Sequence, residues 1–309
     1  MKVVSYLGSV PSRNSNKQKT ELLVKYAKGV SAAGDQSFLH TQHTIIDADV
    51  GVIQGWVYDN TNPPHLKLRK QVIDTQLSKN KFVVCADASL FNYVDKTNPH
   101  GYLRYSFNGV FPTTGIYCDD KIDPTRWNSI SNKLKINIEE TKTKGNCIIL
   151  MLQRQGGWSM GGKNVEQWAF ETINQIRRYS DRPIIVRPHP GDKQAPVYLN
   201  PTKTRLKNLP NVKISPQGRP LEEELHKAWA VVNHNSSAAV GPIIQGYHCF
   251  ITDPRHSQNT EVSNTDFKLI ENPKTFDREG WLQRISMFHW SFKELESGEC
   301  WQHMRNYCQ

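Results

Sequence analysis

Residues 147–163 read CIILMLQRQGGWSMGGK, an apolar run followed by a loop that contains four glycines. A short, continuous apolar run is typical of a parallel strand that is buried on both faces. The same order of apolar run and polar loop returns at residues 183–192 (PIIVRPHPGD) and 231–242 (VVNHNSSAAVGP). Because helical segments alternate with these runs, the sequence predicts a parallel sheet with ligands bound beyond the carboxyl ends of its strands.

The N-terminal part of the chain repeats this alternation. Apolar runs at residues 3–7, 50–54 and 82–86 predict strands, and residues 21–30 and 65–78 predict helices. The polar segment 125–146 is typical of a domain linker with a short helix. We therefore expect an α/β protein with two facing Rossmann-like domains and a cleft between them. Residues 1–142 form the first domain and residues 143–280 the second, and the helical segment 281–309 packs back on the first.

The composition favours an anionic partner, because the 309 residues carry a formal net charge of +10. A generally basic surface without a polyanionic partner stays open as the alternative. No apolar run approaches the roughly 20 residues that span a bilayer, and the first residues lack the pattern of a signal peptide. We expect a cytoplasmic protein that does not bind a membrane. The six cysteines show no C-x-x-C spacing, so no structural metal is expected.

Three loops of the second half carry residues suited to phosphate binding. Prolines on both sides present His189 rigidly after a strand. Ser236 and Ser237 open a helix, whose N-terminus attracts anions. The glycine-rich loop allows close approach of a ligand between two cations. A proline-stiffened loop, ordinary helix capping and a flexible surface loop are the respective alternatives. The predicted donor-binding residues are Arg154, Gly156, Gly157, Lys163, Arg187, His189, Ser236 and Ser237.

This pair of an R-P-H-P turn and a later Ser-Ser turn resembles the HP and SS motifs of GT-B sialyl-, Kdo- and capsule-type transferases. The resemblance covers residues 147–255 and implies that His189, Ser236 and Ser237 contact the phosphates of a nucleotide-sugar. A UDP-sugar is favoured as co-substrate, and neither a metal nor another cofactor is expected to be required. Those families often hold the ribose with a Glu after the serines, and this chain has Gly241 and Pro242 there.

Residues 153–192 also resemble uncharacterised proteins of tailed bacteriophages. Together with the basic charge, this favours double-stranded phage DNA with hydroxymethylated pyrimidines as the acceptor, and a host-cytoplasmic enzyme. A capsule- or lipopolysaccharide-type transferase that uses a CMP- or UDP-sugar is one alternative. A nucleotide- or DNA-binding module without catalysis is another. The predicted acceptor-binding residues are Arg13, Lys17, Lys67, Arg69, Lys70 and Arg104, although charge runs on helices are also typical of solvated faces.

Glycosyl transfer needs a general base for the acceptor hydroxyl, and a carboxylate at a strand end of the first domain suits this role. Asp87 directly follows the apolar run 82–86 and is the predicted catalytic base. A helix-capping or turn role is the alternative for this residue. Asp49 and Asp59 are further candidates.

Overall fold

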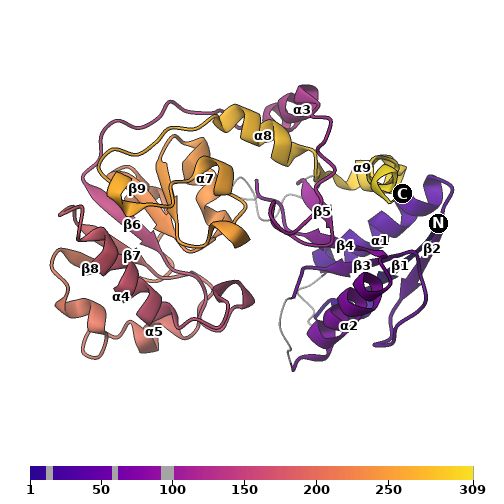
Figure 1. Ribbon diagram of the computed structural model, residues 1–309, viewed down its shortest axis with the longest axis horizontal. Helices are drawn as coiled ribbons and strands as arrows, with labels where there is room; N and C mark the ends of the chain where they lie inside the picture. The colour runs from indigo at the N-terminus through magenta and orange to yellow at the C-terminus, as the bar shows by residue number, and fades with distance from the viewer. Residues whose placement is uncertain (12–16, 58–61, 92–100, 309) are drawn as a thin grey trace. The chain divides into compact units, whose positions relative to one another are not determined.

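The computed structural model describes residues 1–11, 17–57, 62–91 and 101–308 of the chain. The chain forms two compact units (Figure 1). Unit 1 comprises Met1–Ile136 and Leu282–Gln309, and unit 2 comprises Asn137–Trp281. Each unit contains its own sheet. Among the described residues, no helix is long and apolar enough to cross a membrane.

The sheet of unit 1 has six strands in the order β11-β5-β4-β3-β1-β2. Four of them are parallel: β1 (Lys2–Tyr6), β2 (Gln36–His40), β3 (Val50–Gln54) and β4 (Phe82–Asp87). β5 (Leu103–Phe107) pairs antiparallel with β4, and β11 (His289–Trp290) pairs antiparallel with β5 at the edge of the sheet. The strand order reverses between β1 and β3, which makes their carboxyl ends the topological switch point of this sheet.

Successive side chains of these strands point to opposite faces of the sheet, and each face packs against a different helix. Helix α1 (Lys17–Ala32) packs on the face that contains Val3 and Val52. Helix α2 (Pro64–Ser78) packs on the opposite face, which contains Val4 and Ile53. Helix α3 (Pro124–Leu134) also belongs to unit 1 and buries Trp127, Ile130 and Leu134. The predicted linker therefore begins with a packed amphipathic helix.

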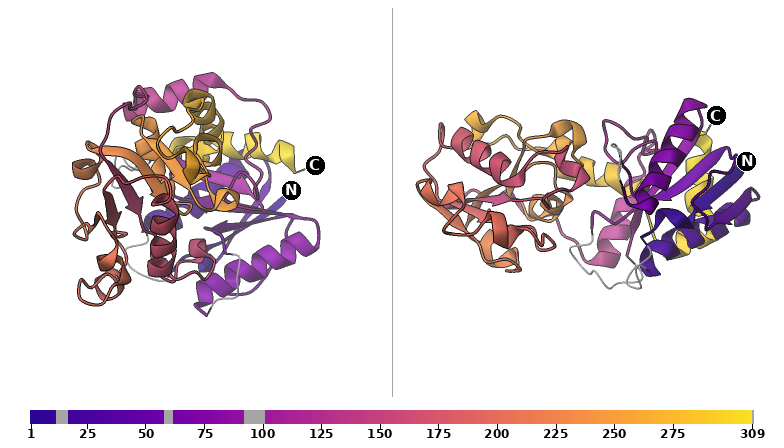
Figure 2. Two further views of the ribbon diagram at one scale, coloured as in Figure 1. Left: turned by 60° about the vertical axis from the view of Figure 1, so that its left-hand side comes forward. Right: turned by 90° about the horizontal axis from the view of Figure 1, so that it is seen from below.

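The C-terminal helices α9 (Phe292–Ser297) and α10 (Glu299–Met304) lie beside α1, and the chain ends near its own N-terminus (Figures 1 and 2). Trp301 Nε1 donates a 2.7 Å hydrogen bond to Asp35 Oδ2, and the N-terminal amine also pairs with Asp35. A Cβ at Gly29 of α1 would lie 1.9 Å from the carbonyl oxygen of Leu295. Glycine is therefore needed where α1 meets α9.

Unit 2 is built on five parallel strands in the order β10-β9-β6-β7-β8. They are β6 (Cys147–Met151), β7 (Ile184–Arg187), β8 (Val212–Ile214), β9 (Ala228–Asn233) and β10 (His248–Ile251). Helix α4 (Val165–Ile176) buries its apolar side against one face of the sheet. Three short helices of this unit are α5 (Ala195–Tyr198), α6 (Glu222–Leu225) and α7 (Val240–Ile244), and α8 (Arg278–Ser286) begins in unit 2 and ends in unit 1. Here the order reverses between β6 and β9.

The predicted α/β class with mainly parallel sheets is confirmed. Strands β5, β8 and β11 were not predicted. The two tyrosines on either side of the predicted acceptor residue Arg104 do not present their rings for base stacking, because Tyr102 and Tyr105 are buried. Tyr105 stacks on Tyr26 with ring centroids 5.1 Å apart, and its hydroxyl donates to the carbonyl of Leu22. Its apolar surface stabilises the core of unit 1.

Candidate functional site

Four loops meet at the carboxyl edge of the unit 2 sheet, because parallel strands end on the same side. They follow β6, β7, β9 and β10, and the first and third flank the switch point. Side-chain hydrogen bonds join these loops to one another. The three segments predicted to bind the donor therefore belong to one edge of one sheet.

Asp192 joins the loop after β7 to the loop after β6. Its side chain is buried, and Oδ2 accepts hydrogen bonds from the Gln155 backbone N–H at 2.9 Å and the Tyr198 hydroxyl at 2.8 Å. Oδ1 accepts a further bond from the Gln194 N–H. Burial and the neighbouring carboxylate raise the pKa of Tyr198, so this phenol stays a donor. Asp192 thus fixes the position of the glycine-rich loop relative to His189.

Gln153 and Asn235 join the loops after β6 and β9. Gln153 Nε2 donates to Asn235 Oδ1 at 2.7 Å and to Ser159 Oγ at 2.9 Å. Asn235 Nδ2 donates to the Ser159 carbonyl at 2.9 Å and to Asp253 Oδ2, which follows β10, at 3.2 Å. Both amides are buried. Paired donors and acceptors of this kind hold a glycine-rich segment in one conformation.

A histidine and carboxylate cluster lies beside these amides. His234 Nδ1 lies 2.7 Å from Thr252 Oγ1, and burial lowers the pKa of His234 to about 4, although Asp253 opposes this shift. Burial alone would raise the pKa of Asp253, but His256, His234 and Asn235 lower it below its usual value. His234 is therefore neutral and Asp253 ionised at neutral pH. No group of three or more potential metal ligands occurs in the part of the chain that the structure describes.

His189 is half-buried, and the backbone N–H of Gly191 donates a 3.0 Å hydrogen bond to its Nδ1. Because Nδ1 accepts this bond, a neutral His189 carries its hydrogen on Nε2. The short turn between Pro188 and Gly191 thus selects the tautomer as well as the ring orientation. A donor at a fixed position suits a phosphate oxygen.

The glycine-rich loop places cations at this edge. Arg154 and Lys163 are exposed, and Lys163 acts electrostatically on His234. Gly156 has φ +71°, a conformation that other residues rarely adopt. A Cβ at Gly157 would lie 3.0 Å from the carbonyl of Arg154, so this position also favours glycine.

The serine turn differs in detail from the prediction. Ser236 Oγ accepts a hydrogen bond from the Ala238 N–H, and the chain continues as a 3₁₀ turn (Ser237–Ala239) before α7. The expected helix is thus only a short one, so its dipole contributes less to anion binding than predicted. Asn259 Nδ2 donates to the carbonyl of Ser236 and fixes the turn. Both serines are partly exposed.

Arg187 has a different environment from the other predicted donor residues. Its Nη1 donates to Glu224 Oε2 at 3.1 Å, and its Nη2 donates to the Arg219 carbonyl. Glu224 is buried and also accepts a bond from Ser215. Arg187 thus stabilises the packing of α6 against β7.

The carboxyl edge of the unit 1 sheet holds Asp87 and Arg104 together. They are register partners on β4 and β5, and Arg104 Nη2 donates to Asp87 Oδ2 at 2.8 Å. Asp87 Oδ1 accepts from the Ala88 N–H. The loop that follows is held by His289 of β11, whose Nε2 accepts a bond from the Leu90 N–H. The sequence placed Asp87 and Arg104 in separate roles and did not indicate this ion pair.

The remaining predicted acceptor residues are distributed over α1 and α2. Arg69 is buried, whereas Lys67 is exposed. Lys70 forms an ion pair with Asp74 one turn along α2. The backbone of Lys17 begins α1. Arg13 and Asp59 lie outside the described residues.

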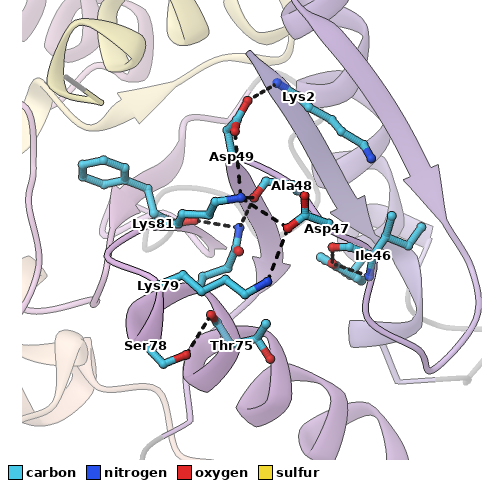
Figure 3. Close-up of polar contacts among 12 residues, drawn as sticks. Lys2, Ile46, Asp47, Ala48, Asp49, Thr75, Ser78, Lys79 and Lys81 are labelled. Atoms are coloured by element: carbon cyan, nitrogen blue, oxygen red, sulfur yellow. Dashed lines mark hydrogen bonds and ion pairs between the residues drawn. The ribbon is translucent and has the colours of Figure 1, made fainter.

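Asp49 lies at the amino end of β3 (Figure 3). Asp87 is the last residue of β4, which is parallel to β3, so the two carboxylates lie at opposite edges of the sheet. Its Oδ2 accepts a hydrogen bond from the Lys2 N–H at 2.7 Å, and Lys81 lies 4.0 Å from its Oδ1. Lys79 and Lys81 both donate to Asp47 at this edge. Ligands of open α/β sheets bind at the carboxyl ends, so Asp49 is a poor candidate for a catalytic base.

Comparison with known proteins identifies the architecture. The chain is similar to the β-Kdo 2,4 transferase KpsC of Thermosulfurimonas dismutans, with a TM-score of 0.52 and 11% identity over 93% of this chain and 90% of that chain. It is also similar to the β-Kdo 2,7 transferase KpsC of the same organism, with a TM-score of 0.52 and 10% identity over 98% and 99% of the two chains. The chain has the GT-B fold.

At these identities the similarity defines the fold alone. The UDP-GlcNAc 2-epimerase of Methanocaldococcus jannaschii is a more distant structure, with a TM-score of 0.35 and 14% identity over 92% and 98% of the two chains. No protein-family model and no curated protein sequence matches the chain.

Proposed function

We propose that this protein is a glycosyltransferase that moves a sugar from a nucleotide-sugar to a hydroxyl acceptor. The observation that carries the proposal is the carboxyl edge of unit 2. There Asp192, Gln153 and Asn235 hold three loops in register around a switch point, and these loops present the donor residues. Switch points are the usual ligand sites of open α/β sheets.

The donor residues match the charge that develops during transfer. As the anomeric C–O bond breaks, negative charge grows on the leaving diphosphate, and fixed donors and cations stabilise it. His189 donates through Nε2–H, and Arg154 and Lys163 supply positive charge. The hydroxyls of Ser236 and Ser237 donate from the adjoining turn. Arg187 is omitted from this set because Glu224 neutralises it. These residues neutralise the leaving group without a metal ion in this proposal.

Asp87 is the proposed general base. Its carboxylate lies at a carboxyl strand end and forms an ion pair with Arg104, and in this proposal it accepts the hydroxyl proton of the acceptor. The bond to Arg104 orients Oδ2, and the Ala88 N–H orients Oδ1. Asp87 keeps its predicted role in this proposal, whereas Arg104, which was predicted to bind the acceptor, instead orients Asp87.

Hydroxymethylated DNA remains the proposed acceptor, on the basis of the +10 net charge. Transfer of an acidic sugar is the second candidate, because the two structures of similar fold are named as Kdo transferases.

Incubation of the full chain with UDP- and CMP-sugars, and with modified DNA or an oligosaccharide, tests the proposal. Mass spectrometry should find a glycosylated acceptor and free nucleotide for one pair of nucleotide-sugar and acceptor. A protein that only binds these molecules would produce neither the glycosylated acceptor nor the free nucleotide.

A further inference from the structure

Arg69 carries a buried positive charge at the switch point of unit 1. Its side chain is 7% exposed, and Nε donates to the carbonyl of Ser9 at 2.9 Å while Nη2 donates to Gln54 Oε1 at 2.6 Å. Ser9 follows β1 and Gln54 ends β3, so the guanidinium joins the two loops that flank the switch. Both acceptors are neutral. Among the described residues, no carboxylate forms an ion pair with Arg69.

A buried charge without a counter-charge is costly to the fold. Asp87 acts on Arg69 electrostatically, but its carboxylate pairs with Arg104 at 2.8 Å. The third nitrogen, Nη1, makes no hydrogen bond to the described residues and lies against Gly55, where a Cβ would come within 2.9 Å of it. Glycine at position 55 thus leaves room beside the guanidinium.

Other groups at this edge have the same sign of charge. His65 lies one turn before Arg69 on α2, Lys19 lies in the first turns of α1, and His43 follows β2. Burial lowers the pKa of His65, and the positive charges of Arg69, Lys19 and His43 lower it further. Neither α1 nor α2 has an acidic residue in its first turn. Both helices begin at this edge, so their N-terminal dipoles add to the positive potential.

We propose that Arg69, His65 and Lys19 form an anion-binding subsite that receives a phosphate or carboxylate group of the acceptor. The anion supplies a counter-charge that no described residue provides to Arg69 through an ion pair, and it lies at the same strand edge as Asp87. Such a group anchors the acceptor near the proposed base. That the anion belongs to the acceptor rests on the proposed glycosyl transfer, but binding of an anion at this edge does not depend on it.

The ring of His65 provides a local test, since an anion within about 6 Å raises the pKa of a histidine. The full chain with ¹³C-labelled histidine is titrated by NMR, and the His65 signal is assigned by its loss in His65→Gln. Inorganic phosphate and glucuronate are the two probes. We expect one or both to raise the His65 pKa by about 0.5 to 1 unit. The probe that raises the His65 pKa more shows whether the subsite binds phosphate or carboxylate groups.

A pair of lysine variants makes this test specific. Lys19→Gln removes an exposed cation of the subsite and should weaken the effect of the probe at least threefold. Lys79→Gln removes a cation that pairs with Asp47 at the opposite edge (Figure 3) and should leave the effect unchanged. A His65 pKa that neither probe moves, or an equal effect in Lys19→Gln and the unmodified chain, would overturn the proposal. Anion binding without any sugar transfer would refute the proposed function and leave the subsite intact.

Discussion

The buried carboxylate of Asp192 accepts a 2.9 Å hydrogen bond from the backbone N–H of Gln155, 37 residues earlier in the chain. This contact links the turn that presents His189 to the glycine-rich loop that carries Arg154. The two segments therefore keep a fixed relative position before any ligand binds. Preorganised donors of this kind stabilise developing charge without having to reorient.

Loss of this link should weaken donor binding although Asp192 itself need not touch the donor. In Asp192→Asn one oxygen is replaced by an amide nitrogen, which cannot accept bonds from Gln155 and Tyr198. We expect unit 2 to lose about 1–3 kcal/mol of stability and the nucleotide-sugar affinity to fall about tenfold. Calorimetry and denaturant unfolding measure both quantities. Asp181→Asn, an exposed change in the same unit, is the matched control, and equal affinities in the two variants would contradict this role.

The neutral state of buried His234 makes the stability of unit 2 depend on pH. Between the ordinary histidine pKa and the folded value of about 4, the unfolded chain binds a proton at His234 and the folded chain does not. Stability therefore falls as the pH falls through this window, by roughly 3 kcal/mol in total. The lowered pKa of Asp253 affects the stability of unit 2 only at a still lower pH, where this carboxylate becomes protonated.

The exchange rates of backbone amides in β6 and β9 measure the stability of unit 2 separately from that of unit 1. His234→Asn should show a weaker pH dependence than the unmodified chain between about pH 6.5 and pH 4. His226→Asn, which changes an exposed histidine of the same unit, should keep the full dependence. Identical pH profiles for both variants would show that His234 is charged in the folded protein.

If Asp87 is the general base, replacing it should lower the rate of sugar transfer but leave the affinity for the donor nearly unchanged. Asp87→Asn should reduce transfer by about 10²- to 10⁴-fold, the usual cost of removing a general base. Donor affinity should stay within about twofold, because the donor residues belong to unit 2. Thermal unfolding is measured alongside, since Arg104 loses its ion pair. Asp74→Asn, which breaks an exposed ion pair on α2, controls for the lost charge, and normal turnover in Asp87→Asn would exclude this residue as the base.

A DNA acceptor predicts a strong dependence of affinity on salt. Each phosphate contact adds about −0.9 to the slope of log K against log salt concentration. Binding of modified duplex DNA should therefore fall steeply between about 50 and 200 mM salt, and Lys67→Gln should make the slope shallower by about one. Fluorescence anisotropy with labelled duplex measures both slopes. A flat dependence would favour a neutral acceptor.

The strand positions were predictable where burial is complete. Residues 50–54 were predicted as a strand and form β3 with the same bounds, and all five residues are buried. Strand β11 consists of two residues in an aromatic, helical segment, so it has no periodicity to detect. His289 accepts the hydrogen bond from the Leu90 N–H across 199 positions of sequence.

The site was predictable as a set of loops but not as a set of contacts. The proline turn and the serine turn follow predicted strands, and parallel topology brings them to one edge. The partner of each charged residue depends on packing that single-sequence patterns do not encode. The sequence predicts Arg187 as a donor-binding residue, but in the structure it forms an ion pair with Glu224 of α6. The sequence also predicts Arg69 as part of a basic run on a helix, but its side chain is buried.

Donor binding at the carboxyl edge of unit 2 is the central claim, and calorimetry of His189→Ala tests it most directly. The variant loses the Nε2–H donor, and because the His189 side chain is only half-buried, the fold should stay intact by circular dichroism. UDP- and CMP-sugars are titrated into the unmodified chain and into the variant. We predict that one nucleotide-sugar binds the unmodified chain and that its affinity falls at least tenfold in the variant. Equal affinity in a folded His189→Ala protein would contradict the assignment of this edge as the donor site.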